Sequence, residues 1–80
     1  MPACRTPLPP WVVARRHLLG ERIAASRRKQ QLSQDQLADR IGLERRSIQR
    51  YERGERDPRY SDLLLIADAL AVPVETLVQQ

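Results

Sequence analysis

The sequence of 80 residues is long enough for one small domain with a single hydrophobic core, and this length excludes a multidomain enzyme. Hydrophobic residues make up 41% of the chain and charged residues 30%, a composition typical of a folded domain that excludes disorder of the whole chain. The net charge is +4, and residues 61–80 contain no arginine or lysine, so the N-terminal and central parts present either a site for a polyanion or a solvated basic surface.

The chain begins with a proline-rich segment. Prolines at positions 2, 7, 9 and 10 predict an extended, flexible arm over residues 1–10. From Trp11 onwards, apolar residues recur at spacings of four and seven, which predicts a helix over about residues 11–31 that can begin as early as Pro10. We expect Trp11 to anchor this helix in the core or at its rim, and His17 to lie at the surface.

A capping signal marks the start of the second helix. Ser33 can accept a hydrogen bond from the backbone amide of Gln36, whose side chain can reach back to residue 33. Gly42 suits the left-handed residue that ends a helix, so the second helix is predicted over residues 34–41. After a short connection, a third helix is predicted over residues 45–53.

Two further helices follow a loop that contains Asp57 and Pro58. One is predicted over residues 61–70, with Ser61 as its cap, and the other over residues 74–79, after Pro73. Residues 11–80 are therefore expected to form one domain, an all-α, compact five-helix bundle.

The third predicted helix has two different faces. At about 100° per residue, Ile48 and Tyr51 fall on one arc and can be buried. The opposite arc carries a glutamine and four arginines: Arg45, Arg46, Gln49, Arg50 and Arg53. These arginines either form a binding surface or solvate an exposed face and pair with acidic residues along the helix.

The spacing of the second and third helices favours the binding surface. Two helices joined by a short turn that contains glycine, the second displaying arginine and glutamine, have the geometry that places a helix in the DNA major groove. Arginine can donate two hydrogen bonds to guanine, and glutamine can pair with adenine. The pattern predicts double-stranded DNA as the partner, with the remaining positive charge on phosphates.

The motifs, taken in order, resemble those of the helix-turn-helix family that includes the phage repressor, Cro and the xenobiotic-response-element regulators. The resemblance covers about residues 19–77 and rests on Leu32-Ser33-Gln34-Asp35-Gln36-Leu37-Ala38, Ile41-Gly42-Leu43, Ser47-Ile48, and Tyr51-Glu52-Arg53-Gly54 followed by Pro58. It implies a lambda-repressor-like fold and a transcriptional regulator, with Ala38 as the small residue at the crossing of the two helices.

The resemblance also implies roles for individual residues. Base contacts would come from Arg45, Arg46, Gln49 and Arg50. DNA backbone contacts would come from Ser33, Gln34, Arg53 and Arg59, and Gln34 would also steady a recognition side chain. Arg27 and Glu52 would form a structural ion pair that ties the first helix to the end of the third.

Glu44 departs from the family pattern, which usually places serine or threonine at this position. Glutamate is a weaker cap, although its charge suits a helix N-terminus. Its carboxylate would either weaken affinity by repelling phosphates or accept a hydrogen bond from a cytosine amino group. The residues alone do not decide between these outcomes.

A single recognition helix reads few bases, so we expect a homodimer on a pseudo-palindromic site. The interface is expected in the C-terminal segment, which lacks arginine and lysine, and the candidates are Leu65, Val74, Leu77 and Val78. The alternative is that Leu77 belongs to the core and Leu65 is merely exposed.

The sequence thus predicts a small cytoplasmic DNA-binding regulator, most simply a dimeric repressor. The alternative is an antitoxin or another protein-binding module that uses its DNA-binding face for autoregulation. An enzyme is not expected, because a single histidine without an aligned nucleophile gives no catalytic constellation. One cysteine, Cys4, and one histidine give no metal site, no cofactor is implied, and no apolar run is long enough for a membrane span.

Overall fold

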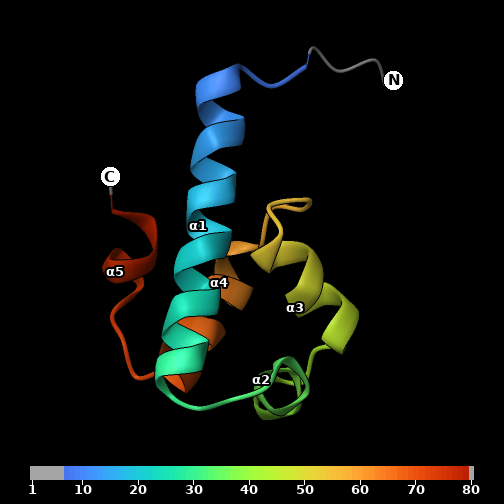
Figure 1. The fold of residues 1–80 in the computed structure, drawn as a ribbon, viewed down its shortest axis with the longest axis vertical. Helices are drawn as coiled ribbons and strands as arrows, with labels where there is room; N and C mark the ends of the chain where they lie inside the picture. Colours follow the sequence, from blue (N-terminus) through green and yellow to red (C-terminus); the bar gives the residue numbers. More distant parts are fainter. Residues whose placement is uncertain (1–6, 80) are drawn as a thin grey trace.

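Five α-helices succeed one another in the computed structural model, which describes residues 7–79 (Figure 1). These residues contain no strand, and the expected all-α, five-helix fold is confirmed. The helices are α1 (Pro10–Lys29), α2 (Gln34–Ile41), α3 (Arg45–Glu52), α4 (Tyr60–Ala69) and α5 (Val74–Val78). None of the helices described here is long and apolar enough to cross a membrane. Residues 7–79 also hold no group of three or more His, Cys, Asp or Glu side chains arranged for a metal ion.

The helix α1 begins at the earliest residue that the sequence pattern allows. Pro10 is the first residue of the helix rather than the last of the arm, because its fixed φ suits the first helical position. Most of the expected arm, residues 1–6 with Cys4, lies outside the described residues. The first turns of α1 extend beyond the other helices (Figure 1), and Trp11 on the first turn is 66% exposed. The expected role of Trp11 as a core or rim anchor is therefore wrong.

Side chains from all five helices meet in one core. The largest fully buried ones lie along or just after these helices and are Ile23, Leu37, Ile48, Ile66, Leu70 and Leu77. Because Leu77 of α5 is completely buried within its own chain, its expected place in a dimer interface is wrong. The apolar side of α5 is used to close the bundle against α1 and α4.

Local signals explain the ends of α2. The Ser33 hydroxyl accepts a hydrogen bond from the Gln36 amide at 3.0 Å, and the Gln36 side chain accepts one from the Ser33 amide at 2.8 Å. Gly42, at φ 73°, ends the helix in the left-handed conformation. In α4 the expected Ser61 cap is wrong, because the helix begins at Tyr60 and the capping position falls on Arg59.

A buried hydrogen bond joins α3 to α4. The Tyr51 hydroxyl donates to Asp62 Oδ2 at 2.9 Å, and both residues are buried. Loss of solvation and, second, the hydrogen bond to Asp62 raise the pKa of Tyr51 above its ordinary value of 10.0. The protonated phenol is therefore part of the folded state.

This raised pKa makes the stability of the fold sensitive to alkaline pH. The contribution of the protonated Tyr51 to the free energy of unfolding is fully present below pH 10, where the phenol is protonated in both the folded and the unfolded chain. This contribution is lost as the pH rises through the higher pKa of the folded chain. Urea unfolding should show this decline in the parent and not in Tyr51→Phe, which should also lose about 2 kcal/mol at pH 7 by leaving Asp62 unpaired. Tyr60→Phe, at a residue that is 69% exposed, should match the parent at every pH.

Candidate nucleic-acid interface

The helix α3 is anchored on one side and open to solvent on the other. Ile48 is completely buried and Tyr51 is 6% exposed, so the apolar arc packs against the core. The guanidinium-bearing residues Arg45, Arg46, Arg50 and Arg53 are all exposed, and Gln49 is half-buried at the edge of this face. The structure thus separates the anchoring residues from the expected base-reading residues.

The turn before α3 fixes how this helix leaves α2. The Leu43 amide donates to the Ala38 carbonyl at 3.0 Å, which closes the end of α2 around Gly42. Ala38 is 2% exposed and Leu43 is partly buried against the core. Both side chains of this turn region thus belong to the core or pack against it.

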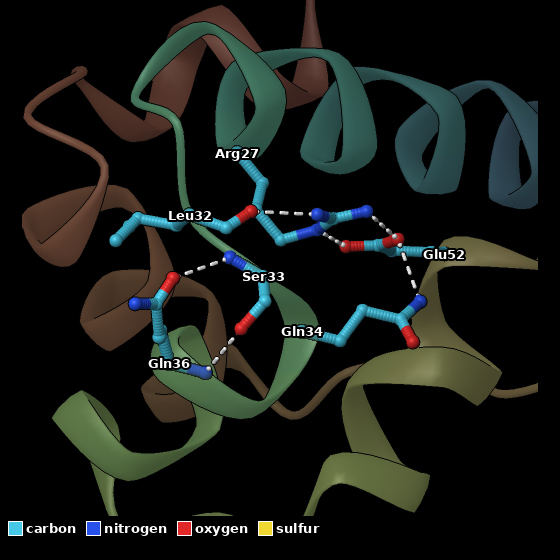
Figure 2. A network of polar contacts seen from close by, with 6 residues as sticks. All are labelled: Arg27, Leu32, Ser33, Gln34, Gln36 and Glu52. Carbon is cyan, nitrogen blue, oxygen red and sulfur yellow. Dashed lines mark hydrogen bonds and ion pairs between the residues drawn. The ribbon is translucent and has the colours of Figure 1, made fainter.

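A polar network ties the far end of α3 to α1 and α2 (Figure 2). Arg27 Nε donates to Glu52 Oε2 at 2.7 Å, and Arg27 Nη2 donates to Glu52 Oε1 at 3.1 Å. Arg27 Nη1 donates to the Leu32 carbonyl at 2.7 Å, in the segment between α1 and α2. The structure therefore brings together the two residues of the expected ion pair, with side chains only 11% and 6% exposed.

Gln34 takes part in the same network. Its amide nitrogen donates to Glu52 Oε1 at 3.0 Å, which joins the start of α2 to the end of α3 (Figure 2). The residue is half-buried at the first position of α2. Because the amide nitrogen carries two hydrogens, one remains available to a phosphate oxygen.

A shallow depression lies beside this network, where α1, α2 and α3 meet. It measures about 320 Å³ and is lined by Glu21, Ala24, Arg28, Gln34, Glu52 and Arg53. Arg28 was not among the residues singled out from the sequence. Its position in the basic last turn of α1, next to Arg27, is the signal that could have indicated it.

Gly20 is a second residue that the sequence analysis missed. It is buried where α1 crosses the end of α3, and an added Cβ atom would lie 2.5 Å from the backbone oxygens of both Tyr51 and Glu52. The absence of a side chain allows the two helix backbones to approach. This approach brings Glu52 within reach of Arg27.

The remaining candidate residues lie at the surface with different degrees of exposure. Ser33 and Arg59 are exposed, although the Ser33 hydroxyl also caps α2. Leu65 and Val78 are 45% and 49% exposed, and Val74 is half-buried. Leu64, which the sequence analysis did not select, is 43% exposed next to Leu65.

Comparisons with known proteins agree with this geometry. A family model described as helix-turn-helix matches residues 23–77. A transcriptional repressor of a cryptic phage in Vibrio cholerae, RstR, is 40% identical over 57 residues, which cover 71% of this chain and 51% of RstR. An uncharacterized transcriptional regulator from Rhodospirillum rubrum is 44% identical over 71% of this chain and 53% of its own length. The chain spans about half the length of the curated relatives it matches.

Two solved structures are similar over nearly their whole length. The restriction-modification controller protein C.AhdI from Aeromonas hydrophila superposes with a TM-score of 0.78, at 33% identity over 80% of this chain and 97% of that one. The P22 c2 repressor in complex with a synthetic operator gives a TM-score of 0.74, at 34% identity over 78% and 94%. The family model covers more than half of the chain, and its matched segment contains the capped α2, the Gly42 turn and the arginine-bearing α3. The chain therefore belongs to the helix-turn-helix family.

Proposed function

We propose that this protein binds double-stranded DNA in a sequence-specific manner and acts as a homodimeric transcriptional repressor. The observation that carries the proposal is the division of α3 into a buried anchor, Ile48 and Tyr51, and an exposed face of arginines. A helix whose apolar face is packed against the core can enter the major groove while its position in the fold stays fixed. A role on DNA would place the protein in the cytoplasm.

The exposed residues of α3 would read bases. Arg45, Arg46 and Arg50 can each donate two hydrogen bonds to the O6 and N7 atoms of guanine, which favours guanine-containing half-sites. Gln49 is half-buried and would reach a base only at the edge of the contact.

Residues around the depression would hold the DNA backbone. Ser33 and Gln34 lie at the start of α2, whose N-terminal amides favour a phosphate. Arg53 and Arg28 line the depression, and Arg59 is exposed before α4. Phosphate contacts from these residues would set the register of α3 without reading sequence.

The proposed homodimer uses the exposed apolar side chains of α4 and α5. Leu65 and Val78, with the half-buried Val74, remain as candidates once Leu77 is assigned to the core, and the exposed Leu64 is a further one. These are few exposed apolar side chains, so dimerisation would be weak in solution and completed on DNA. The repressor role is favoured over an antitoxin because two of the related proteins are named repressors.

Selection of bound duplexes from a random pool, followed by affinity measurements at several salt concentrations, tests the proposal. We expect a pseudo-palindromic motif and a log–log salt slope of several units, because each neutralised phosphate contributes about 0.9. Arg46→Ala should weaken binding by about 1–3 kcal/mol and relax preference at one base pair, whereas Arg53→Ala should weaken binding to all sequences equally.

Arg15→Ala is the matched control, because it removes the same charge from an exposed residue in the first half of α1. It should change neither base preference nor the relative affinities of different duplexes. A pool that yields no motif would contradict sequence-specific binding. Sedimentation of a monomer on the selected operator would contradict the dimer.

A further inference from the structure

Glu44 places a carboxylate at the start of α3 without a structural partner among the described residues. It occupies the capping position, at φ −81° and ψ 149°, and its backbone carbonyl accepts from the Ser47 amide at 3.0 Å. Its side chain makes no capping hydrogen bond, and within residues 7–79 it forms no ion pair. The residue is exposed.

The acid at the other end of α3 provides a contrast. Glu52 is held by Arg27 and Gln34 and is nearly buried, so its charge is compensated within the fold. The arginines that follow Glu44, Arg45 and Arg46, are exposed and form no ion pair with its carboxylate. The negative charge of Glu44 is therefore unpaired within residues 7–79, at the start of the helix from which the proposed base-reading residues project.

The structural benefit of this side chain is small. A serine or aspartate at the same position would satisfy a backbone amide of α3, which glutamate here does not. The contribution of Glu44 to stability is then limited to the attraction between its carboxylate and the positive end of the helix dipole. In a protein that binds DNA, the same charge would also be repelled by phosphates.

We infer that Glu44 is a specificity-determining residue, which selects a cytosine in each half-site by accepting a hydrogen bond from the cytosine N4 amino group. The inference rests on the proposed DNA-binding function. An ionised carboxylate only accepts hydrogen bonds. In the major groove guanine presents two acceptors, thymine one acceptor and adenine an acceptor beside its donor, whereas cytosine presents the N4 donor. Glu44 thus attracts cytosine and repels guanine and thymine.

This mechanism predicts an unusual combination of effects. Glu44→Ala should abolish the cytosine preference, and it should also raise affinity for unrelated duplexes, because a charge that repels phosphates is removed. Glu44→Gln keeps the size of the side chain but adds donors, so the preferred base at that position should change from cytosine to adenine. A residue that only interacts with the helix dipole would alter stability and leave base preference unchanged.

The experiment compares the parent, Glu44→Gln and Glu44→Ala on the selected operator, with all four base pairs tested at every position of one half-site. Asp39→Asn is the matched control, because it removes one charge from another exposed acid that forms no ion pair within residues 7–79. We expect one position where the parent prefers cytosine by about tenfold, the order of one good base contact, and where only the Glu44 variants change that preference.

Two results would overturn the inference. If the parent selects a motif but both Glu44 variants retain its base preference at every position, Glu44 reads no base, while the proposed function stands. If the parent selects no motif, the proposed function fails and the inference fails with it. Urea unfolding of the variants separates a change in recognition from a change in stability.

Discussion

Replacing Glu52 with alanine is expected to lower the free energy of unfolding by about 3–5 kcal/mol, the largest effect expected from a single substitution in this chain. The guanidinium group of Arg27 would keep its bond to the Leu32 carbonyl but lose both bonds to the carboxylate, in a place where only 11% of its side chain meets solvent. A guanidinium charge that is buried without a partner destabilises the folded state. The total free energy of unfolding of a native protein is only about 5–15 kcal/mol, so this substitution should remove a large share of the stability of the fold.

Urea unfolding of Glu52→Ala beside Glu55→Ala measures this effect. Glu55 is 3.9 Å from Arg53, with both side chains more than half exposed, so its removal should change stability by less than about 1 kcal/mol. Replacing both partners, with Arg27→Met and Glu52→Leu, should recover much of the loss because no buried charge remains. A Glu52→Ala variant as stable as Glu55→Ala would show that the ion pair does not hold α1 on α3.

Gly20→Val is expected to lower the free energy of unfolding by about 3 kcal/mol or more. The first added carbon would already lie 2.5 Å from two backbone oxygens at the end of α3, and backbone atoms cannot move aside as a flexible side chain can. The helix α1 would have to shift away from α3, which would also lengthen the bonds between Arg27 and Glu52. The loss exceeds any gain from replacing glycine within a helix, which is less than about 1 kcal/mol.

The control for this substitution lies on the same helix. Ala25 is exposed on α1, so Ala25→Val should cost only the difference in helix propensity, less than about 1 kcal/mol. The gap between the two variants in urea unfolding gives the cost of the clash. Equal midpoints for Gly20→Val and Ala25→Val would show that α1 and α3 tolerate separation.

The helices and the two-faced α3 could be predicted because they depend on local patterns. The Ser33 capping signal and the burial of Ile48 follow from residues close together in sequence. The expectation for Trp11 is wrong because its size suggests burial, whereas on the first turn of α1 it remains 66% exposed. Leu77 was misplaced because residue type cannot show whether an apolar helix face meets its own chain or another.

The packing of α1 on α3 could be predicted only in part. The resemblance indicated that Arg27 and Glu52 pair, but the hydrogen bonds to Leu32 and from Gln34 depend on the relative placement of three helices. Gly20 gave no signal, since a glycine within a predicted helix suggests only local weakness. Its importance comes from a backbone 31 or 32 residues away in the chain.

The separation of anchor and exposed face on α3 also bears on how such proteins diverge. Arg45, Arg46 and Arg50 are exposed and take no part in the core, so exchanging them alters the outer surface while Ile48 and Tyr51 preserve the scaffold. New target sequences could then arise through single substitutions that leave the core intact. After duplication of such a gene, the two proteins could come to bind different sites while every intermediate sequence still folds.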